Sequence, residues 1–203
     1  MSFISASPSI IRSVKQRELL NVWLRAVAGP HALPHAETFQ PERLADELPD
    51  LMRFDVVGDG NLARFRITYE GTRLTEAYDN EDVAPADRTN RFLDDAIGSL
   101  RYQRVCDSYR VCISQRRPTY TVSTVYDSDG KEVAYERLLL PFGEADAVEQ
   151  IVGSYKTISV DGRFQLRGLM GLNVSSVPQM TFMAVIDRNI IERPGADDAI
   201  EPD

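Results

Sequence analysis

The strongest candidates for chemistry in this chain are two adjacent ionic residues, Glu136 and Arg137. They interrupt an apolar run from Tyr135 to Phe142. A buried charge needs a partner, and an arginine can bind an anion through two parallel hydrogen bonds. Two roles are therefore open. The pair can serve the fold, with Arg137 bound to an acid of the helical middle or Glu136 bound to Arg66 across a sheet, or Arg137 can bind an anionic ligand.

The residues around this pair predict a long antiparallel hairpin. Thr119 to Tyr126 is rich in Thr, Val and Tyr, and the Asp-Gly turn at 127–130 follows it. We expect the returning strand to end at Pro141, because proline cannot donate to a central ladder. Side chains alternate along a strand. Glu136 and Arg137 should therefore point to opposite faces of the sheet, with Leu138 beside Glu136 and Tyr135 beside Arg137.

Metal and disulfide chemistry find little support in the sequence. His31 and His35 have the spacing of a helical metal pair, but Pro34 lies between them and favours a loop. Cys106 and Cys112 are six residues apart, which places them about 120° apart around a helix. We therefore predict two free thiols and no metal site.

The sequence also argues against an enzyme. It shows no nucleophile next to a base and no glycine-rich phosphate loop. Its 31 acidic residues make a chance carboxylate pair expected, so no catalytic dyad is proposed.

Composition indicates an ordinary globular protein of 203 residues with a formal net charge of −8. Five of the acids lie in the last twelve residues. An acidic chain is not expected to bind nucleic acid. No signal peptide and no apolar run long enough for a membrane span is visible, so the sequence predicts a cytoplasmic protein away from the membrane.

The predicted elements indicate an α+β fold. An apolar stripe predicts a helix from Ser9 to Ala28, with Ser13 and Gln16 as a capping box. Two strands, a helical middle and three further strands then follow, which is typical of a helical crossover on an antiparallel sheet. The predicted bounds are strands at 51–57, 62–70, 119–126, 131–141 and 148–158, and a long helix at 90–115.

Four features of this pattern carry a resemblance to PAS domains. They are the first helix with Trp23, Leu48-Pro49 before the first strand, Phe65-Arg66-Ile67 running into Gly71-Thr72, and the segment Glu136 to Phe142. The chain resembles the single-domain PAS proteins of alphaproteobacteria, over residues 15–158. The resemblance implies a five-stranded antiparallel sheet in order 2-1-5-4-3, a long helix between strands two and three, and an N-terminal helix.

The predicted domain organisation combines the order of the predicted elements, the composition of the C-terminal segment and this resemblance. It gives an N-terminal helical extension at 1–50, a PAS-like domain at 51–158, a C-terminal extension at 159–191 and a disordered acidic tail at 192–203.

The resemblance implies a sensory or regulatory module. A small molecule would bind between the sheet and the long helix, and the signal would pass through a homodimer or an unknown regulatory partner. The alternative is a ligand-free interaction adaptor with a filled core. The expected ligand-binding residues are Phe65, Tyr102, Cys106, Tyr109, Tyr120 and Arg137, and the expected dimer interface is Val14, Leu19, Val22 and Trp23.

Two cofactors known from PAS proteins are not expected here. Asn90-Arg91-Phe92-Leu93 resembles part of a flavin-binding motif, but the reactive cysteine is missing. No histidine lies on the long helix, where an axial ligand of haem would be needed. The cofactor therefore stays unknown, with haem, covalent flavin and metal all disfavoured.

Overall fold

One mixed β-sheet forms the centre of the molecule. The computed structural model describes residues 2–27, 32–39, 41–78, 88–144, 147–159, 162–167, 169, 178–187 and 189. Across the sheet, its strands in these residues are β1 (Ile4–Ala6), β7 (Gln179–Ile186), β4 (Thr119–Tyr126), β5 (Glu132–Glu144), β6 (Ala147–Ile158), β2 (Leu51–Val57) and β3 (Arg64–Glu70). All neighbours are antiparallel except β1 and β7, which are parallel.

The predicted five-stranded antiparallel PAS sheet is wrong, because the described residues form a seven-stranded mixed sheet. Strand β7 pairs with β4 from Thr119↔Val185 to Thr124↔Gln179. Strand β1 then pairs with β7 in parallel. Both additions were hard to see in the sequence, since β1 has three residues and β7 follows a stretch rich in Gly and Ser.

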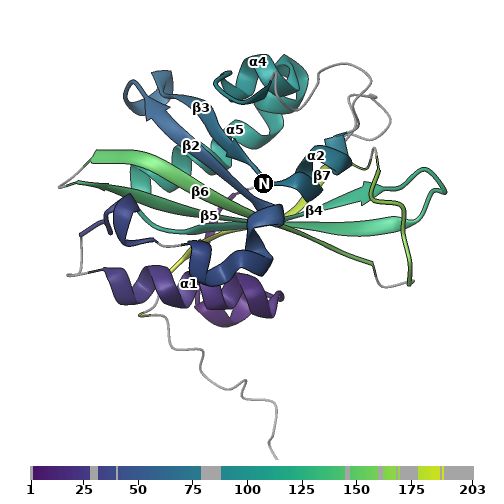
Figure 1. Cartoon of the computed structure of the whole chain (residues 1–203), viewed down its shortest axis with the longest axis horizontal. Helices are drawn as coiled ribbons and strands as arrows, with labels where there is room; N and C mark the ends of the chain where they lie inside the picture. The colour runs from purple at the N-terminus through teal and green to yellow at the C-terminus, as the bar shows by residue number, and fades with distance from the viewer. Residues whose placement is uncertain are drawn as a thin grey trace, which may run out of the picture.

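Helices cover both faces of the sheet (Figure 1). Helices α2 (Thr72–Tyr78), α4 (Leu93–Ile97) and α5 (Ser99–Gln115) lie on one face, and α1 (Val14–Ala26) lies on the other. Each face has its own apolar core. Phe54, Phe65 and Tyr109 belong to the core under α5, while Leu19 and Leu138 belong to the core under α1. The short 3-10 helices are η1 (Pro8–Ile10), η2 (Ala36–Thr38), η3 (Pro41–Asp50) and η4 (Gly60–Leu62).

The single long helix predicted from Asn90 to Gln115 is also wrong. Asn90 has a φ of 70° and Phe92 forms a β-bridge with Arg66, so helix cannot begin before Leu93. Gly98, at a φ of 76°, then separates α4 from α5. Glycine adopts this left-handed conformation at little cost, and it redirects the chain between the two helices.

Helix α1 begins at Val14 rather than at the predicted Ser9. Residues 8–10 form η1, and the Ser13 side chain accepts a hydrogen bond from the Gln16 amide (3.3 Å). The predicted capping box is only half formed, because Gln16 Nε2 donates instead to the Ser154 carbonyl of β6 (3.0 Å). Trp23 Nε1 donates to the Pro141 carbonyl of β5 (2.7 Å). Two buried side-chain hydrogen bonds thus fix α1 to the sheet.

Strand β5 does not end at Pro141, contrary to the prediction. It continues to Glu144, paired with β6. Its pairing with β4 stops at Thr119↔Leu139, so β5 is already an edge on that side when the chain reaches Pro141. A proline is tolerated where no ladder hydrogen bond is required.

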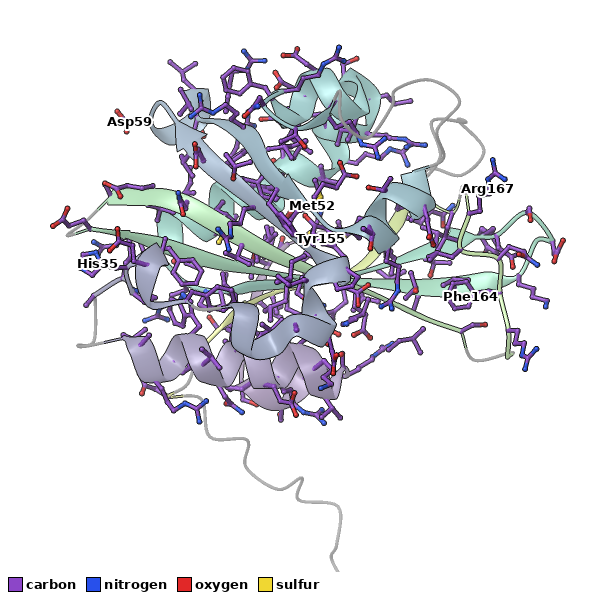
Figure 2. The ribbon with its side chains drawn as sticks, in the orientation of Figure 1. His35, Met52, Asp59, Tyr155, Phe164 and Arg167 are labelled. Atoms are coloured by element: carbon purple, nitrogen blue, oxygen red, sulfur yellow. The ribbon has the colours of Figure 1, made fainter. Side chains whose placement is uncertain are left out.

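The C-terminal extension packs on the end of the β4–β5 hairpin as well as adding β7. Phe164 and Leu166 contact the core under α5, and Figure 2 shows Phe164 and Arg167 at that end of the molecule. Asp127 of the hairpin turn accepts a hydrogen bond from the Gln165 amide (3.0 Å). This bond and two more from the turn hold the pKa of Asp127 below its usual range. The acidic tail predicted at 192–203 lies outside the described residues.

No helix in the described ranges combines the length and the apolar character that crossing a membrane would need.

Candidate functional site

The two ionic residues of β5 lie on opposite faces of the sheet, as alternation predicted. Leu138 and Leu140 accompany Glu136 into the core under α1, whereas Tyr135 and Leu139 accompany Arg137 into the core under α5. Both ionic side chains are buried. The two charges therefore have separate environments and separate roles.

A cavity of about 290 Å³ lies between α5 and the sheet, beside Arg137. Helix α5 forms one wall, β4, β5 and β6 form the floor, and β7 closes a side. The lining residues are Leu93, Ile97, Arg101, Gln103, Arg104, Val105, Asp107, Ser108, Tyr109, Ser123, Tyr135, Arg137, Tyr155, Pro178, Gln179, Met180 and Met183.

Arg137 provides a buried positive charge at this cavity. Its side chain is 6% exposed, and its Nε makes no hydrogen bond within the described part of the chain. No carboxylate of the described residues lies within ion-pair distance of it. Its Cζ lies 5.4 Å from the centre of the Tyr109 ring, a cation–π contact. The ring offsets part of the cost of burial, but an anion would offset far more.

Tyr109 connects the cavity to the aromatic core behind it. Its ring centre lies 5.2 Å from that of Phe54 and 4.9 Å from that of Phe65. Its hydroxyl shares a hydrogen bond of 2.8 Å with the Tyr155 hydroxyl. Burial raises the pKa of Tyr109, while the Arg137 charge and its hydrogen bond oppose that rise. Tyr109 therefore keeps its proton near pH 7.

Gly153 makes room for Tyr155 on the floor of the cavity. A Cβ placed on Gly153 would lie 2.8 Å from the Tyr155 hydroxyl and from its ring edge. The two residues share a face of β6, so the Tyr155 ring lies back over the glycine. Figure 2 shows Tyr155 in the middle of the molecule, close to Met52 of β2. Any other residue at position 153 would push the ring out of place.

The structure brings together only part of the predicted ligand site. Tyr109 and Arg137 line the cavity. Phe65 lies behind Tyr109 in the core, and Tyr102 and Cys106 lie on α5 without lining the cavity. Tyr120 lies on the opposite face of the sheet, in the core under α1, so it does not share this space.

Sequence reasoning missed several lining residues. Tyr135 shares the face of Arg137 at spacing two, which was a usable signal. Tyr155 pairs directly with Arg137 across β5 and β6, and that register comes from the structure rather than from the sequence. No sequence signal indicated Met180 and Met183 as lining residues, because β7 itself was not predicted. The cavity depends on strand pairings between distant segments, which a single sequence does not reveal.

Glu136 lies fully buried beneath the N-terminal end of α1. The predicted pairing of Glu136 with Arg66 is wrong, since Arg66 binds Asp55 (2.7 Å) on the adjacent β2. The nearest cation to Glu136 is Arg12, whose Nε lies 4.0 Å from Oε1. Burial raises the pKa of Glu136, while Tyr120, Arg12 and the Ser13 amide oppose the rise. This side of β5 is a structural polar site rather than part of the cavity.

The remaining candidate residues form no further site. Cys106 and Cys112 are free and buried, and burial raises the pKa of both thiols. His35 lies in the loop before η2 (Figure 2), while His31 lies outside the described residues. Among the residues that the structure describes, no three His, Cys, Asp or Glu side chains gather in a way that could hold a metal ion.

The predicted dimer interface is partly used within the chain. The side chains of Leu19 and Trp23 are buried between α1 and the sheet, and Val22 packs at the margin of the same core. Val14 is 59% exposed. The homodimer stays a prediction, and Leu19 and Trp23 are committed to the fold.

Comparison of the sequence with models of protein families finds no match, and comparison with curated proteins finds none either. The cavity itself is therefore the feature that can indicate a function.

Proposed function

We propose that this chain is a regulatory protein that binds a small molecule in the cavity between α5 and the sheet. The observation that carries the proposal is the buried Arg137 beside a cavity, with no carboxylate partner among the described residues. Desolvating a cation without an ionic partner costs stability. A bound anionic ligand would offset that cost.

The composition of the walls supports ligand binding. Ligand cavities combine mostly apolar walls with a few polar groups that fix orientation. Here the apolar groups include Leu93, Ile97 and Met183, and the polar groups converge on Arg137 and Tyr109. An adaptor with a filled core, the alternative from the sequence, has no use for this space.

A regulatory role is favoured over catalysis. Among the described residues that line the cavity there is no histidine and no cysteine, so these lining residues provide no His- or Cys-based nucleophile–base pair. Output would pass through a partner protein or a second copy of the chain.

Native mass spectrometry of the purified protein tests this proposal. We expect an adduct of small mass that disappears when the protein is denatured. In the variant Ser108→Leu the new side chain fills part of the cavity, because Ser108 lines it from α5. That variant should lose the adduct, and the control Ser114→Leu, at an exposed position of the same helix, should keep it.

Folding of both variants is checked by circular dichroism and thermal unfolding. An adduct that survives in Ser108→Leu would place the ligand elsewhere. If the wild-type protein carries no adduct and no compound of a metabolite panel raises its Tm, the proposal is wrong.

A further inference from the structure

The charge inside the cavity limits the charge of its ligand. Arg137 is the lining cation that is buried and lacks an ionic partner in the described residues, whereas Arg101 already has an interaction of its own. Arg104 and Asp107, of opposite sign, are exposed on α5 at the mouth. One buried guanidinium compensates one negative charge. A phosphate monoester carries about −1.5 to −2 at pH 7, which would leave part of its charge buried and unpaired.

The hydrogen-bond donors at the cavity favour a ligand with a planar anionic group. The guanidinium fork matches the two oxygens of a carboxylate, which can accept two parallel hydrogen bonds. The Tyr109 and Tyr155 hydroxyls meet at 2.8 Å beside it and provide a further neutral donor. The lining residues that the structure describes include no glycine. They meet α5 along its side rather than at its N-terminal residue Ser99, so they do not form the nest of backbone amides that phosphate groups use.

The walls favour a flat, apolar body. The Tyr135 and Tyr155 ring centres lie 5.9 Å apart at an angle of 39°, and Met180 and Met183 of β7 line the same cavity. Aromatic rings and thioethers pack well against another aromatic ring. A volume of about 290 Å³, at about 30 Å³ for each water-sized group, holds on the order of ten non-hydrogen atoms.

We infer that the ligand is a small aromatic monocarboxylate, with its carboxylate on Arg137 and its ring between the tyrosines and the methionines of β7. This inference depends on the proposed function, because it specifies the ligand of the same cavity. It specifies the charge, the head group and the shape of the ligand, and each of these three properties can be tested separately.

The test is a titration of the ¹⁵N-labelled protein with three probes of similar shape, followed by NMR. Phenylacetate is the carboxylate, phenylacetamide is its neutral isostere and benzyl phosphate is the more highly charged analogue. We expect phenylacetate to shift the amide signals around Tyr109 and Arg137. It should bind about 10- to 100-fold more tightly than phenylacetamide, the range expected for hydrogen bonds to a charged group.

Variants of Arg137 separate charge from geometry. Arg137→Met should weaken phenylacetate binding by about 10- to 100-fold and leave phenylacetamide unchanged. Arg137→Lys keeps the charge without the fork and should recover only part of the affinity. Arg25→Met, at an exposed position of α1 on the opposite face, is the matched control and should bind like wild type.

Three results would overturn the inference: equal binding of phenylacetate and phenylacetamide, tighter binding of benzyl phosphate, or no site-specific shifts with any of the three. None of these outcomes would remove an adduct seen by native mass spectrometry. Loss of the ligand class is therefore distinguishable from loss of the binding function.

Discussion

Glu136 and Arg137 are neighbours in sequence, yet their charged side chains are buried in different surroundings. Arg137 is buried next to a cavity that a ligand can fill. Glu136 is buried against α1, where Arg12 is 4.0 Å away and itself 62% exposed. That distant, solvated partner compensates the carboxylate poorly. The ionised form of Glu136 is therefore a cost to the fold.

We predict that Glu136→Gln stabilises the protein near pH 7. The folded-state pKa of Glu136 is raised by burial, so the folded chain holds this proton more tightly than the unfolded chain. Wild-type stability then falls as the pH rises from the ordinary glutamate pKa through the raised one. The variant lacks this loss, so its free energy of unfolding should exceed that of wild type above that range.

Urea unfolding between pH 4 and pH 8 measures the difference. The difference in free energy of unfolding between Glu136→Gln and wild type should increase as the pH rises. Glu149→Gln, on an exposed position of β6, is the control and should show no such trend. A variant that is less stable than wild type at pH 8 would mean that the carboxylate contributes a net favourable interaction with α1.

At the scale of elements, one buried ion pair fastens the segment before α4 to β3. Arg88 donates to both carboxylate oxygens of Glu70, at 2.8 to 3.2 Å, and both side chains are about 95% buried. Two backbone hydrogen bonds between Ile67 and residues 90–91 continue the attachment. The segment thereby covers the outer edge of β3, which would otherwise expose unpaired backbone groups.

Arg88→Met should lower the free energy of unfolding by about 3 to 5 kcal/mol, because it leaves the Glu70 carboxylate buried without its arginine. The double variant Arg88→Met, Glu70→Met should recover much of that loss. Chemical denaturation of both, with the exposed Arg91→Met as control, measures the coupling. Equal destabilisation in the single and double variants would show that packing rather than the buried charge decides the cost.

Local pattern predicted the elements whose signal lies within a few residues. Thr119–Tyr126 and Leu51–Val57 are confirmed as strands, and the hairpin turn at Asp127 is confirmed by its own hydrogen bonds. The break at Gly98 and the continuation of β5 through Pro141 were missed. In both cases the outcome depends on which neighbour the backbone meets, and that information comes from other parts of the chain.

At the scale of the whole molecule, the sheet joins the two ends of the chain. Strand β1 pairs with β7, β7 pairs with β4, and β7 also provides Met180 and Met183 to the cavity. The site was only partly predictable for this reason. Tyr109 and Arg137 lie on elements with clear periodicity, whereas the wall opposite them depends on a strand that pairs across more than 50 residues of sequence.

A chain that ends at Ile158 should therefore fold poorly. Without β7, the β4 edge would expose its backbone groups and β1 would lose its partner, and exposed edges promote association. We expect a lower Tm and soluble aggregates in size-exclusion chromatography. A chain that ends at Asn189 keeps β7 and is the control. A monomeric 1–158 chain with an unchanged Tm would show that residues 1–158 are stable without β7.

The hydrogen bond from Trp23 to Pro141 gives the protein an optical reporter. Trp23 is the only tryptophan of the chain, it is 5% exposed, and it contacts the strand that carries Arg137 four residues earlier. Indole emission responds to the polarity around the ring and to loss of its hydrogen bond. Fluorescence of the unlabelled wild-type protein thus monitors whether α1 stays docked while the opposite face of the same strand is occupied.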